Sequence, residues 1–118
     1  MTVLVVEDSA PVRARVVALL REYGLEVIGE AATAAEALAL ADSLRPDAIV
    51  LDLNLPDGDG MDILPALKAR RPAPLVAVLT NSAQVECRDR CLALGADHFF
   101  DKSREFEAVA DALFRHAA

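Results

Sequence analysis

Acidic residues follow two short apolar runs of the chain. Glu7 and Asp8 come directly after the run 3–6, and Asp52 comes directly after the run Ala48–Leu51. If these runs are neighbouring strands, three carboxylates converge, and one pair at about 4 Å costs roughly 4 kcal/mol at an effective dielectric constant of about 20. Such a group retains a proton or binds a cation. All-oxygen ligands suit Mg²⁺, which commonly bridges to phosphate.

Two further polar side chains follow apolar runs. Thr80 follows the run 75–79, and Lys102 lies shortly after the run 98–100. With the acidic group they match the parts needed for phosphoryl transfer onto a carboxylate. Asp52 is the candidate nucleophile, Mg²⁺ neutralises the phosphoryl oxygens, and Thr80 and Lys102 bind the remaining oxygens. The alternative is that Glu7 and Asp8 only stabilise a helix N-terminus, where acidic residues are favoured.

A regular alternation of two kinds of segment must position these residues. Short runs rich in apolar or β-branched residues predict strands, and segments with helical spacing of apolar residues lie between them. In the first of these segments one apolar stripe is formed by Val12, Val16, Leu19, Leu20 and Tyr23. The predicted strands are residues 3–6, 26–29, 48–51, 75–79 and 98–100.

Capping residues predict where the helices begin and end. Ser9 is a candidate N-cap followed by Pro11, and Gly24 is a candidate stop. The second helix opens on the capping-box spacing from Thr33 to Glu36. The other predicted helices are 61–71, 84–94, and one that runs from an N-cap at Ser103 through Leu113.

Five strands alternating with five helices predict an α/β protein of (βα)₅ type, with a doubly wound five-stranded parallel sheet covered by helices on both faces. In such sheets ligands bind at the carboxyl ends of the strands. If the strand order is 2-1-3-4-5, the four strands that end in polar residues are contiguous. The length of 118 residues predicts a single domain over residues 1–118.

Charge and composition argue against several classes of function. The formal net charge of −7 argues against binding to the phosphates of nucleic acids. The apolar runs are far shorter than a membrane span, and the start of the chain lacks the basic stretch of a secretory signal. The two cysteines provide no disulfide framework. We therefore predict a cytoplasmic protein with no direct nucleic-acid or membrane partner.

The chain resembles the receiver domain of two-component response regulators over essentially its whole length. The resemblance rests on VVEDS at residues 5–9, AIVLDLNLP at 48–56 with Gly58 or Gly60 beyond it, Thr80, and GADHFFDK at 95–102. It implies a flavodoxin-like fold with the strand order 2-1-3-4-5. It also implies a phosphoprotein of phosphorelay signal transduction, in which Asp52 becomes an aspartyl phosphate. The phosphodonor would be a histidine kinase or a histidine phosphotransfer protein.

The resemblance further implies how the metal is bound. Asp8 and Asp52 would bind Mg²⁺ directly, and the backbone carbonyl of Asn54 would be the third protein ligand. Glu7 would act mainly through water. The protein would promote its own phosphorylation and dephosphorylation without being an enzyme that acts on other substrates.

Thr80 and Phe99 resemble the switch pair of the family. After phosphorylation the hydroxyl moves toward the phosphoryl group and the ring turns inward, which reshapes the surface of the fourth helix, fifth strand and fifth helix. The charge and acceptor oxygens of the phosphoryl group bias this surface between two states. The partner would be an unknown downstream protein, and dimerisation of the domain or onward transfer of the phosphoryl group stay open as alternative outputs. Core packing is the alternative role for Phe99.

The sequence departs from the family pattern near the predicted site. Ser103 follows Lys102 where most members have proline, commonly after a cis peptide. A cis bond before serine costs about 2.5–4 kcal/mol, which favours a trans bond and a different loop. Asn81 follows Thr80 where alanine or glycine is usual, so it narrows access to Asp52 or hydrogen-bonds the phosphoryl group. Two positions that tune self-dephosphorylation in the family hold Asn54 and Ser82.

Other reactive or charged residues are assigned packing or surface roles. A metal or redox site needs more ligands than two cysteines four positions apart on one helix face provide. The two histidines lie in no motif of a phosphodonor. Two arginines of the first helix lie near the acidic residues, where related domains often dock a kinase, although a solvated helix face explains them as well. These residues are Cys87, Cys91, His98, His116, Arg13 and Arg15.

Three other functions fit parts of the pattern. A degenerate receiver would bind partners without phosphorylation. A phosphatase of the haloacid dehalogenase type has an aspartate two residues after its nucleophile, where this chain has Asn54, and its nucleophile ends the first strand, not the third. A nucleotide or flavin module needs a glycine-rich first turn, whereas residues 7–11 are acidic and lack glycine. The favoured prediction is a stand-alone receiver, because the fifth helix already reaches about His116.

Overall fold

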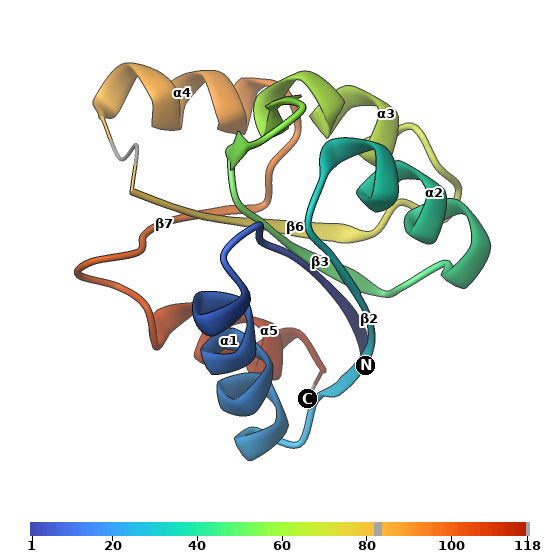
Figure 1. The fold of residues 1–118 in the computed structure, drawn as a ribbon, viewed down its shortest axis with the longest axis vertical. Coiled ribbons are helices and arrows are strands. Elements are labelled where there is room, and N and C mark those ends of the chain that lie inside the picture. The colour runs from blue at the N-terminus through green and yellow to red at the C-terminus, as the bar shows by residue number, and fades with distance from the viewer. Residues whose placement is uncertain (82–83, 118) are drawn as a thin grey trace.

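The computed structural model describes residues 1–81 and 84–117, and its centre is a five-stranded parallel sheet. The strand order is β2-β1-β3-β6-β7, which confirms the predicted order 2-1-3-4-5 (Figure 1). Each strand covers its predicted run and extends it by up to two residues. The strands are β1 (Thr2–Val6), β2 (Glu26–Ala31), β3 (Ala48–Leu51), β6 (Leu75–Thr80) and β7 (His98–Asp101).

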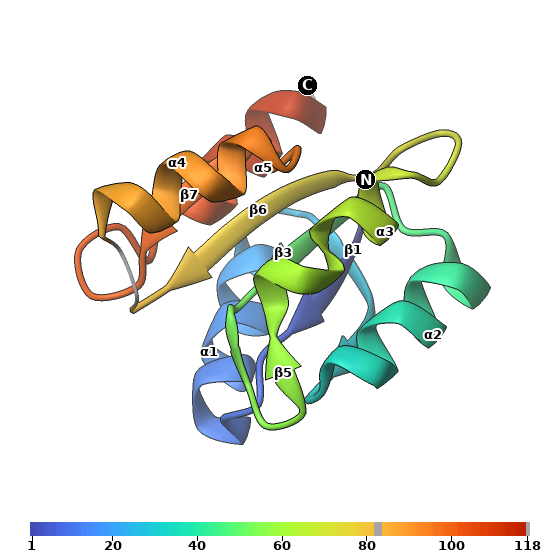
Figure 2. The same ribbon diagram turned by 90° about the horizontal axis from the view of Figure 1, so that it is seen from above.

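Helices cover both faces of the sheet. On one face lie α1 (Ala10–Glu22) and α5 (Ala108–Ala117), and on the other lie α2 (Ala34–Leu44), α3 (Leu64–Lys68) and α4 (Val85–Ala93) (Figure 1). Seen from above, α2 lies toward the β1–β2 side and α4 toward the β7 edge (Figure 2). Because the sheet is covered twice, its strands are apolar on both sides, as the uninterrupted apolar runs predict.

Alternate residues of each strand pack into two separate hydrophobic cores, one on each face of the sheet. In β1, Leu4 and Val6 pack toward α2 and α3, whereas Val3 and Val5 pack toward α1 and α5. The four side chains are at most 1% exposed. The central strand β3 is buried along its whole length. This arrangement fixes the register of the strands, and therefore the level at which each strand ends.

The local signals for the first two helices are confirmed. The Ser9 side chain accepts the hydrogen bond of the Val12 N–H at 3.5 Å, and Gly24, with φ of +77°, follows the helix end. Thr33 caps α2 by accepting the Glu36 N–H at 3.1 Å. In a capping box the Glu36 carboxylate would accept the N–H of Thr33, the capping residue. In the structure it accepts the N–H of Ala32 at 3.2 Å instead.

Two predicted helix boundaries are wrong. The helix predicted over 61–71 is a 3₁₀ turn, η1 (Gly60–Ile63), followed by the short α3 that ends at Lys68. Pro72 restricts the preceding residue to extended backbone, so helical conformation cannot continue up to it. Ser103 does not cap the fifth helix, which begins at Ala108. Its hydroxyl instead donates to Asp101.

A small hairpin after β3 was not predicted. It pairs β4 (Asn54–Leu55) with β5 (Gly58–Asp59) and lies on the side of the sheet that carries α2 and α3 (Figure 1). The Asp57 carboxylate at its turn accepts the N–H groups of Ala34 and Ala35 at 2.7 and 3.0 Å. These two bonds hold the pKa of Asp57 below its usual value. The hairpin is therefore tied to the N-terminus of α2.

The two histidines meet at the edge of the sheet. His98 of β7 and His116 of α5 have their Nε2 atoms 3.0 Å apart, and the His98 ring stacks on Phe100. In the described part of the chain, Glu7, Asp8 and Asp52 form the group of three or more metal-ligating side chains, and neither histidine belongs to it. The predicted structural or surface role of the histidines agrees with these contacts.

The histidine pair predicts a pH effect on stability. Burial, followed by the charge of His116, holds the pKa of His98 below its usual 6.5, against the opposing charge of Asp97. The unfolded chain therefore takes up this proton at a higher pH than the folded chain, and the free energy of unfolding falls as pH drops through 6.5. Urea unfolding at pH 7.5 and 5.5 measures the loss. In His98→Asn the loss is smaller, and an equal loss in both proteins would contradict the prediction.

None of the helices in the described residues is long and apolar enough to cross a membrane.

Candidate functional site

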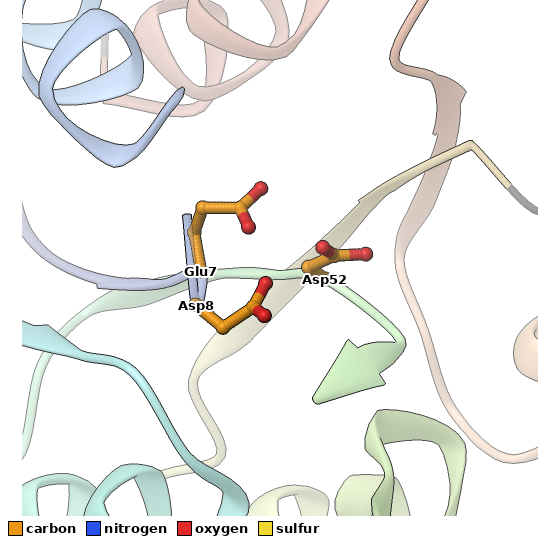
Figure 3. Close-up of side chains that lie close together, drawn as sticks. All are labelled: Glu7, Asp8 and Asp52. Carbon is orange, nitrogen blue, oxygen red and sulfur yellow. The ribbon is translucent and has the colours of Figure 1, made fainter. Parts of the chain in front are cut away.

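Three carboxylates meet at the carboxyl end of the sheet, as the sequence predicts. Glu7 and Asp8 follow β1, and Asp52 follows the adjacent β3 (Figure 3). One carboxylate oxygen from each residue lies within 4.8 Å of the others. Glu7 and Asp52 are each only 4% exposed, whereas Asp8 is exposed. The cluster therefore has a buried floor and one face open to solvent.

Backbone hydrogen bonds hold this end of the sheet in place. The Glu7 N–H donates to the Ala31 carbonyl at 2.9 Å, and the Asp52 N–H donates to the Val6 carbonyl at 3.0 Å. Both acidic residues thus continue the sheet pairing one position past their strands. The two side chains are placed by the sheet register itself, which makes their approach a rigid property of the fold.

Lys102 joins the two buried carboxylates. Its Nζ atom donates to Asp52 Oδ2 at 3.0 Å and to Glu7 Oε1, across 50 and 95 positions of the chain. Burial is the largest influence on Glu7 and raises the pKa of its carboxyl against the opposing hydrogen bond from Lys102. The pKa of Lys102 is raised as well: burial opposes this most strongly, but the bonds to Glu7 and Asp52 and their charges outweigh it.

Thr80 and Phe99 lie on neighbouring strands beside this cluster. Thr80 ends β6, is fully buried, and pairs with Asp101 of β7. Its carbonyl accepts the Lys102 N–H at 2.9 Å, so the lysine backbone is bound to the end of β6. Phe99 is half-buried and packs against the core beneath α2, α3 and α4, while Phe100 packs against the opposite core. Phe99 therefore lies on the face that carries α4.

Arg13 lies beside the acidic residues, as the sequence predicts, and its hydrogen bonds there are an addition. Its Nη1 donates to the Glu7 carbonyl at 2.7 Å, and its Nε donates to the Glu30 carboxylate at 3.1 Å. The Ser9 N–H donates to Glu7 Oε2 at 3.0 Å. The position of Arg13 one turn into α1 was the available signal, because it faces back toward the end of β1. The other arginine of this helix, Arg15, lies over the Phe106 ring at 4.6 Å.

Gly60 brings the chain back against the backbone of Asp52. Its N–H donates to the Leu53 carbonyl at 2.8 Å. A Cβ atom at this position would lie 2.5 Å from the Asp52 carbonyl oxygen and 3.0 Å from Leu53 Cα. The Asn54 N–H donates to Asp52 Oδ1 at 3.3 Å. The loop after β3 therefore folds tightly around the candidate nucleophile.

The departures from the family pattern lie around the same site. In the described residues the cis peptide is Arg71–Pro72, so the bond between Lys102 and Ser103 is trans, as its cost predicts. Asn81 is exposed and follows the buried Thr80 directly. Ser82 lies outside the described residues.

The two cysteines of α4 agree with their predicted packing role. Cys91 is fully buried in the core, and Cys87 packs against the same core. Burial, the largest influence, raises the pKa of Cys91 to about 12. A thiol of this kind stays protonated near neutral pH, which makes it unreactive.

The donor set fits a hard divalent cation. Three carboxylates meet here, and the Lys102 ammonium group donates to two of them, so negative charge is in excess in this cluster. Carboxylate oxygens with one open side suit Mg²⁺, which keeps several water ligands and binds through few protein groups. Repulsion among the carboxylates falls when such an ion binds.

The sequence and the fold are similar to those of response regulators. The family model of the response regulator receiver domain matches residues 3–114. The transcriptional regulatory protein PdtaR of Mycobacterium tuberculosis (strain CDC 1551 / Oshkosh) is 38% identical over 111 residues, which cover 94% of this chain and 54% of PdtaR. A protein-glutamate methylesterase/protein-glutamine glutaminase of Archaeoglobus fulgidus is 39% identical over 121 residues, covering 98% of this chain and 34% of that protein.

A solved structure shares the whole architecture. The CheY-like response regulator receiver domain protein from Methanospirillum hungatei JF-1 has a TM-score of 0.83 and 25% sequence identity, and the match covers 98% of this chain and 94% of that chain. The chain spans about half the length of PdtaR and about a third of the methylesterase. Taken with the family match over residues 3–114, this shows that the chain belongs to the response regulator receiver domain family.

Proposed function

We propose that Asp52 accepts a phosphoryl group from a histidine kinase or a histidine phosphotransfer protein, with Mg²⁺ bound at the acidic cluster. Receiver domains as a class act in phosphorylation-dependent signalling and regulate downstream partners. The observation that most supports Asp52 as the acceptor is its position. Its carboxylate is buried, lies 3.0 Å from the Lys102 ammonium, and belongs to a cluster of three acids.

In the proposed step, a carboxylate oxygen of Asp52 forms a bond to phosphorus while the bond between phosphorus and the donor nitrogen breaks. Lys102 Nζ already donates to Asp52, so it is placed to bind a phosphoryl oxygen on that residue. The Thr80 hydroxyl would bind another. The protein therefore contributes positioning and positive charge to the transfer.

Mg²⁺ would be held by Asp8, Asp52 and the backbone carbonyl of Asn54, with Glu7 acting through water. When bound, it supplies positive charge for the phosphoryl oxygens. Asp8 is the exposed member of the cluster, so it borders the open side through which an ion and a phosphodonor would enter.

We further propose that Thr80 and Phe99 carry the signal to the surface formed by α4, β7 and α5. Thr80 is buried at the end of β6, and Phe99 lies beside Val78 on the neighbouring strand. A displacement of Thr80 toward a phosphoryl group would open space on the face that carries α4. An unknown downstream protein would recognise the changed surface, and the domain itself would act as a switch without an enzymatic reaction of its own.

Three described residues are proposed to set how long the phosphoryl group lasts. Asn54 lies two positions past Asp52, Asn81 is exposed beside Thr80, and Ser103 follows Lys102. Each borders the open side of the site or the lysine loop. They would change the access of water to the aspartyl phosphate or the hydrogen bonds made to it. Ser82 is a fourth such position in the sequence.

Incubation with acetyl phosphate and Mg²⁺ tests the proposal. We expect a phosphorylated species on a phosphate-affinity gel, and we expect it to disappear when Mg²⁺ is chelated. Asp52→Asn should abolish it, because the amide lacks the nucleophilic carboxylate oxygen. Asp62→Asn, at an exposed acid of η1, is the matched control and should leave the species unchanged.

The outcomes distinguish phosphorylation of Asp52 from the main alternative, a degenerate receiver. A species that persists in Asp52→Asn would contradict Asp52 as the acceptor. A folded parent protein that binds Mg²⁺, yet takes no phosphoryl group from acetyl phosphate or from a phosphorylated histidine phosphotransfer protein, would favour a degenerate receiver that binds partners without phosphorylation.

A further inference from the structure

The loop between β7 and α5 is closed by hydrogen bonds around Asp101. Oδ1 of Asp101 accepts the Ser103 N–H at 2.9 Å and the Ser103 hydroxyl at 2.7 Å. One carboxylate oxygen of the residue before Lys102 thus binds the residue after it. Both bonds lower the pKa of Asp101, the hydroxyl bond most, so the carboxylate stays charged and remains a strong acceptor.

The backbone of Asp101 is bound on both sides as well. Its carbonyl accepts the N–H groups of Arg104 and Glu105 at 3.2 and 2.7 Å. Its own N–H donates to the Glu105 carboxylate at 3.1 Å. The turn after Lys102 therefore folds back on Asp101, although no helix begins at Ser103.

We propose that Asp101 and Ser103 are positioning residues for the lysine between them. By fixing the loop around Lys102, they hold its side chain on Glu7 and Asp52. This inference rests on the proposed function, because Lys102 is assigned there to the phosphoryl group. Asp101 and Ser103 would act through Lys102, since their described side-chain hydrogen bonds lie within the loop and not on the acidic cluster.

Holding the long Lys102 side chain in one place costs conformational entropy. A lysine loses up to about 2 kcal/mol of rotamer entropy when it is fixed. Its backbone must therefore start from a defined place and direction. The Lys102 N–H on the Thr80 carbonyl, at 2.9 Å, fixes the place. The two hydrogen bonds from Ser103 to Asp101 fix the direction in which the backbone continues after Lys102. They therefore also fix the direction of the Lys102 side chain.

The first test observes the lysine directly, without a phosphodonor. In nitrogen-15 spectra of the parent protein, the Nζ group of Lys102 should give a shifted and slowly exchanging signal, because it is half-buried and bound to two carboxylates. In Ser103→Ala and Asp101→Ala this signal should move toward that of a free lysine. Ser103→Thr keeps the hydroxyl and should retain the parent signal. Ser43→Ala, at an exposed serine of α2, is the matched control.

The second test measures transfer. With acetyl phosphate at saturating Mg²⁺, Ser103→Ala should be phosphorylated about fivefold more slowly, as expected for one lost hydrogen bond. Ser103→Thr and Ser43→Ala should stay within about twofold of the parent. The Kd for Mg²⁺ should be unchanged in Ser103→Ala, because the metal ligands are intact. A purely structural serine would change stability and leave the Nζ signal in place.

A parent-like Nζ signal in Ser103→Ala and Asp101→Ala would overturn the inference. Loss of the signal in Ser103→Thr would overturn it as well, because the hydroxyl is kept there. Failure of the proposed function gives a different result: the parent protein would show no transfer, while the Nζ signal would still respond to the variants as described.

Discussion

Lys102→Met is expected to lower the free energy of unfolding by about 3 kcal/mol in the absence of divalent cations, the range found when one partner of a buried ion pair is removed. Glu7 and Asp52 are each 4% exposed, and Lys102 is the cation that both contact. Methionine fills the space of the lysine stem but supplies no charge. Two buried carboxylates are then left to repel each other.

Addition of Mg²⁺ should recover much of this loss. A cation that binds the folded protein and not the unfolded chain raises stability with its concentration. Because the lysine charge is missing, the carboxylates should bind the ion more tightly in Lys102→Met than in the parent. Urea unfolding with chelator and with a Mg²⁺ series measures both effects, and the gain in midpoint should be larger in the variant.

The chain offers a matched control, because Lys68 is its other lysine. Lys68 Nζ donates to Asp97 Oδ2 and to the Pro74 carbonyl, each at 2.7 Å. The side chain of Lys68 is 20% exposed and that of Asp97 is 31% exposed. Lys68→Met should therefore cost less, since water can solvate Asp97, and Mg²⁺ should not restore the loss. Equal Mg²⁺ dependence in both variants would contradict the expectation that the Lys102 charge and the ion compete for the same carboxylates.

The elements that the sequence predicts well are those with local causes. Apolar runs set the five strands, and the polar residues just past them meet because parallel strands end at one edge. The caps at Ser9 and Thr33 involve partners three residues away. The meeting of Glu7, Asp52 and Lys102 followed from the order of the strands, although these residues are far apart in the chain.

One feature that was missed depends on a contact between distant segments, and another on a turn that resembles a helix start. The Asp57 carboxylate caps α2 from a hairpin 22 or 23 positions along the chain, and no local pattern marks that pairing. Ser103 has the residue type of an N-cap, but it lies in a turn in which its N–H and hydroxyl both donate to Asp101, and the helix begins later at Ala108. Serine is favoured in such turns as well as at helix N-caps, so its residue type alone does not mark a helix start.

Gly60→Ala is the second large effect that we expect, with a loss of about 3 kcal/mol in the free energy of unfolding, at the upper end of the usual cost of overpacking. The added Cβ would lie 2.5 Å from the Asp52 carbonyl oxygen, 3.0 Å from Leu53 Cα and 3.3 Å from the Asp52 carbonyl carbon. All three are backbone atoms, so no side-chain rotation can relieve the contact. Relief requires the backbone of the candidate nucleophile to move, and phosphorylation from acetyl phosphate should therefore fall as well.

Gly29→Ala is the matched control, because its crowding comes from side-chain ends. The added Cβ would lie 2.7 Å from Leu44 Cδ1 and 3.2 Å from Leu4 Cδ1. Leu44 is 38% exposed, so its side chain can rotate away, and alanine is also favoured over glycine within a strand. We expect a change within about 1 kcal/mol and an unchanged rate of phosphorylation. If Gly60→Ala were as mild as Gly29→Ala, the loop after β3 could shift without cost, and the position of Asp52 would depend on the sheet alone.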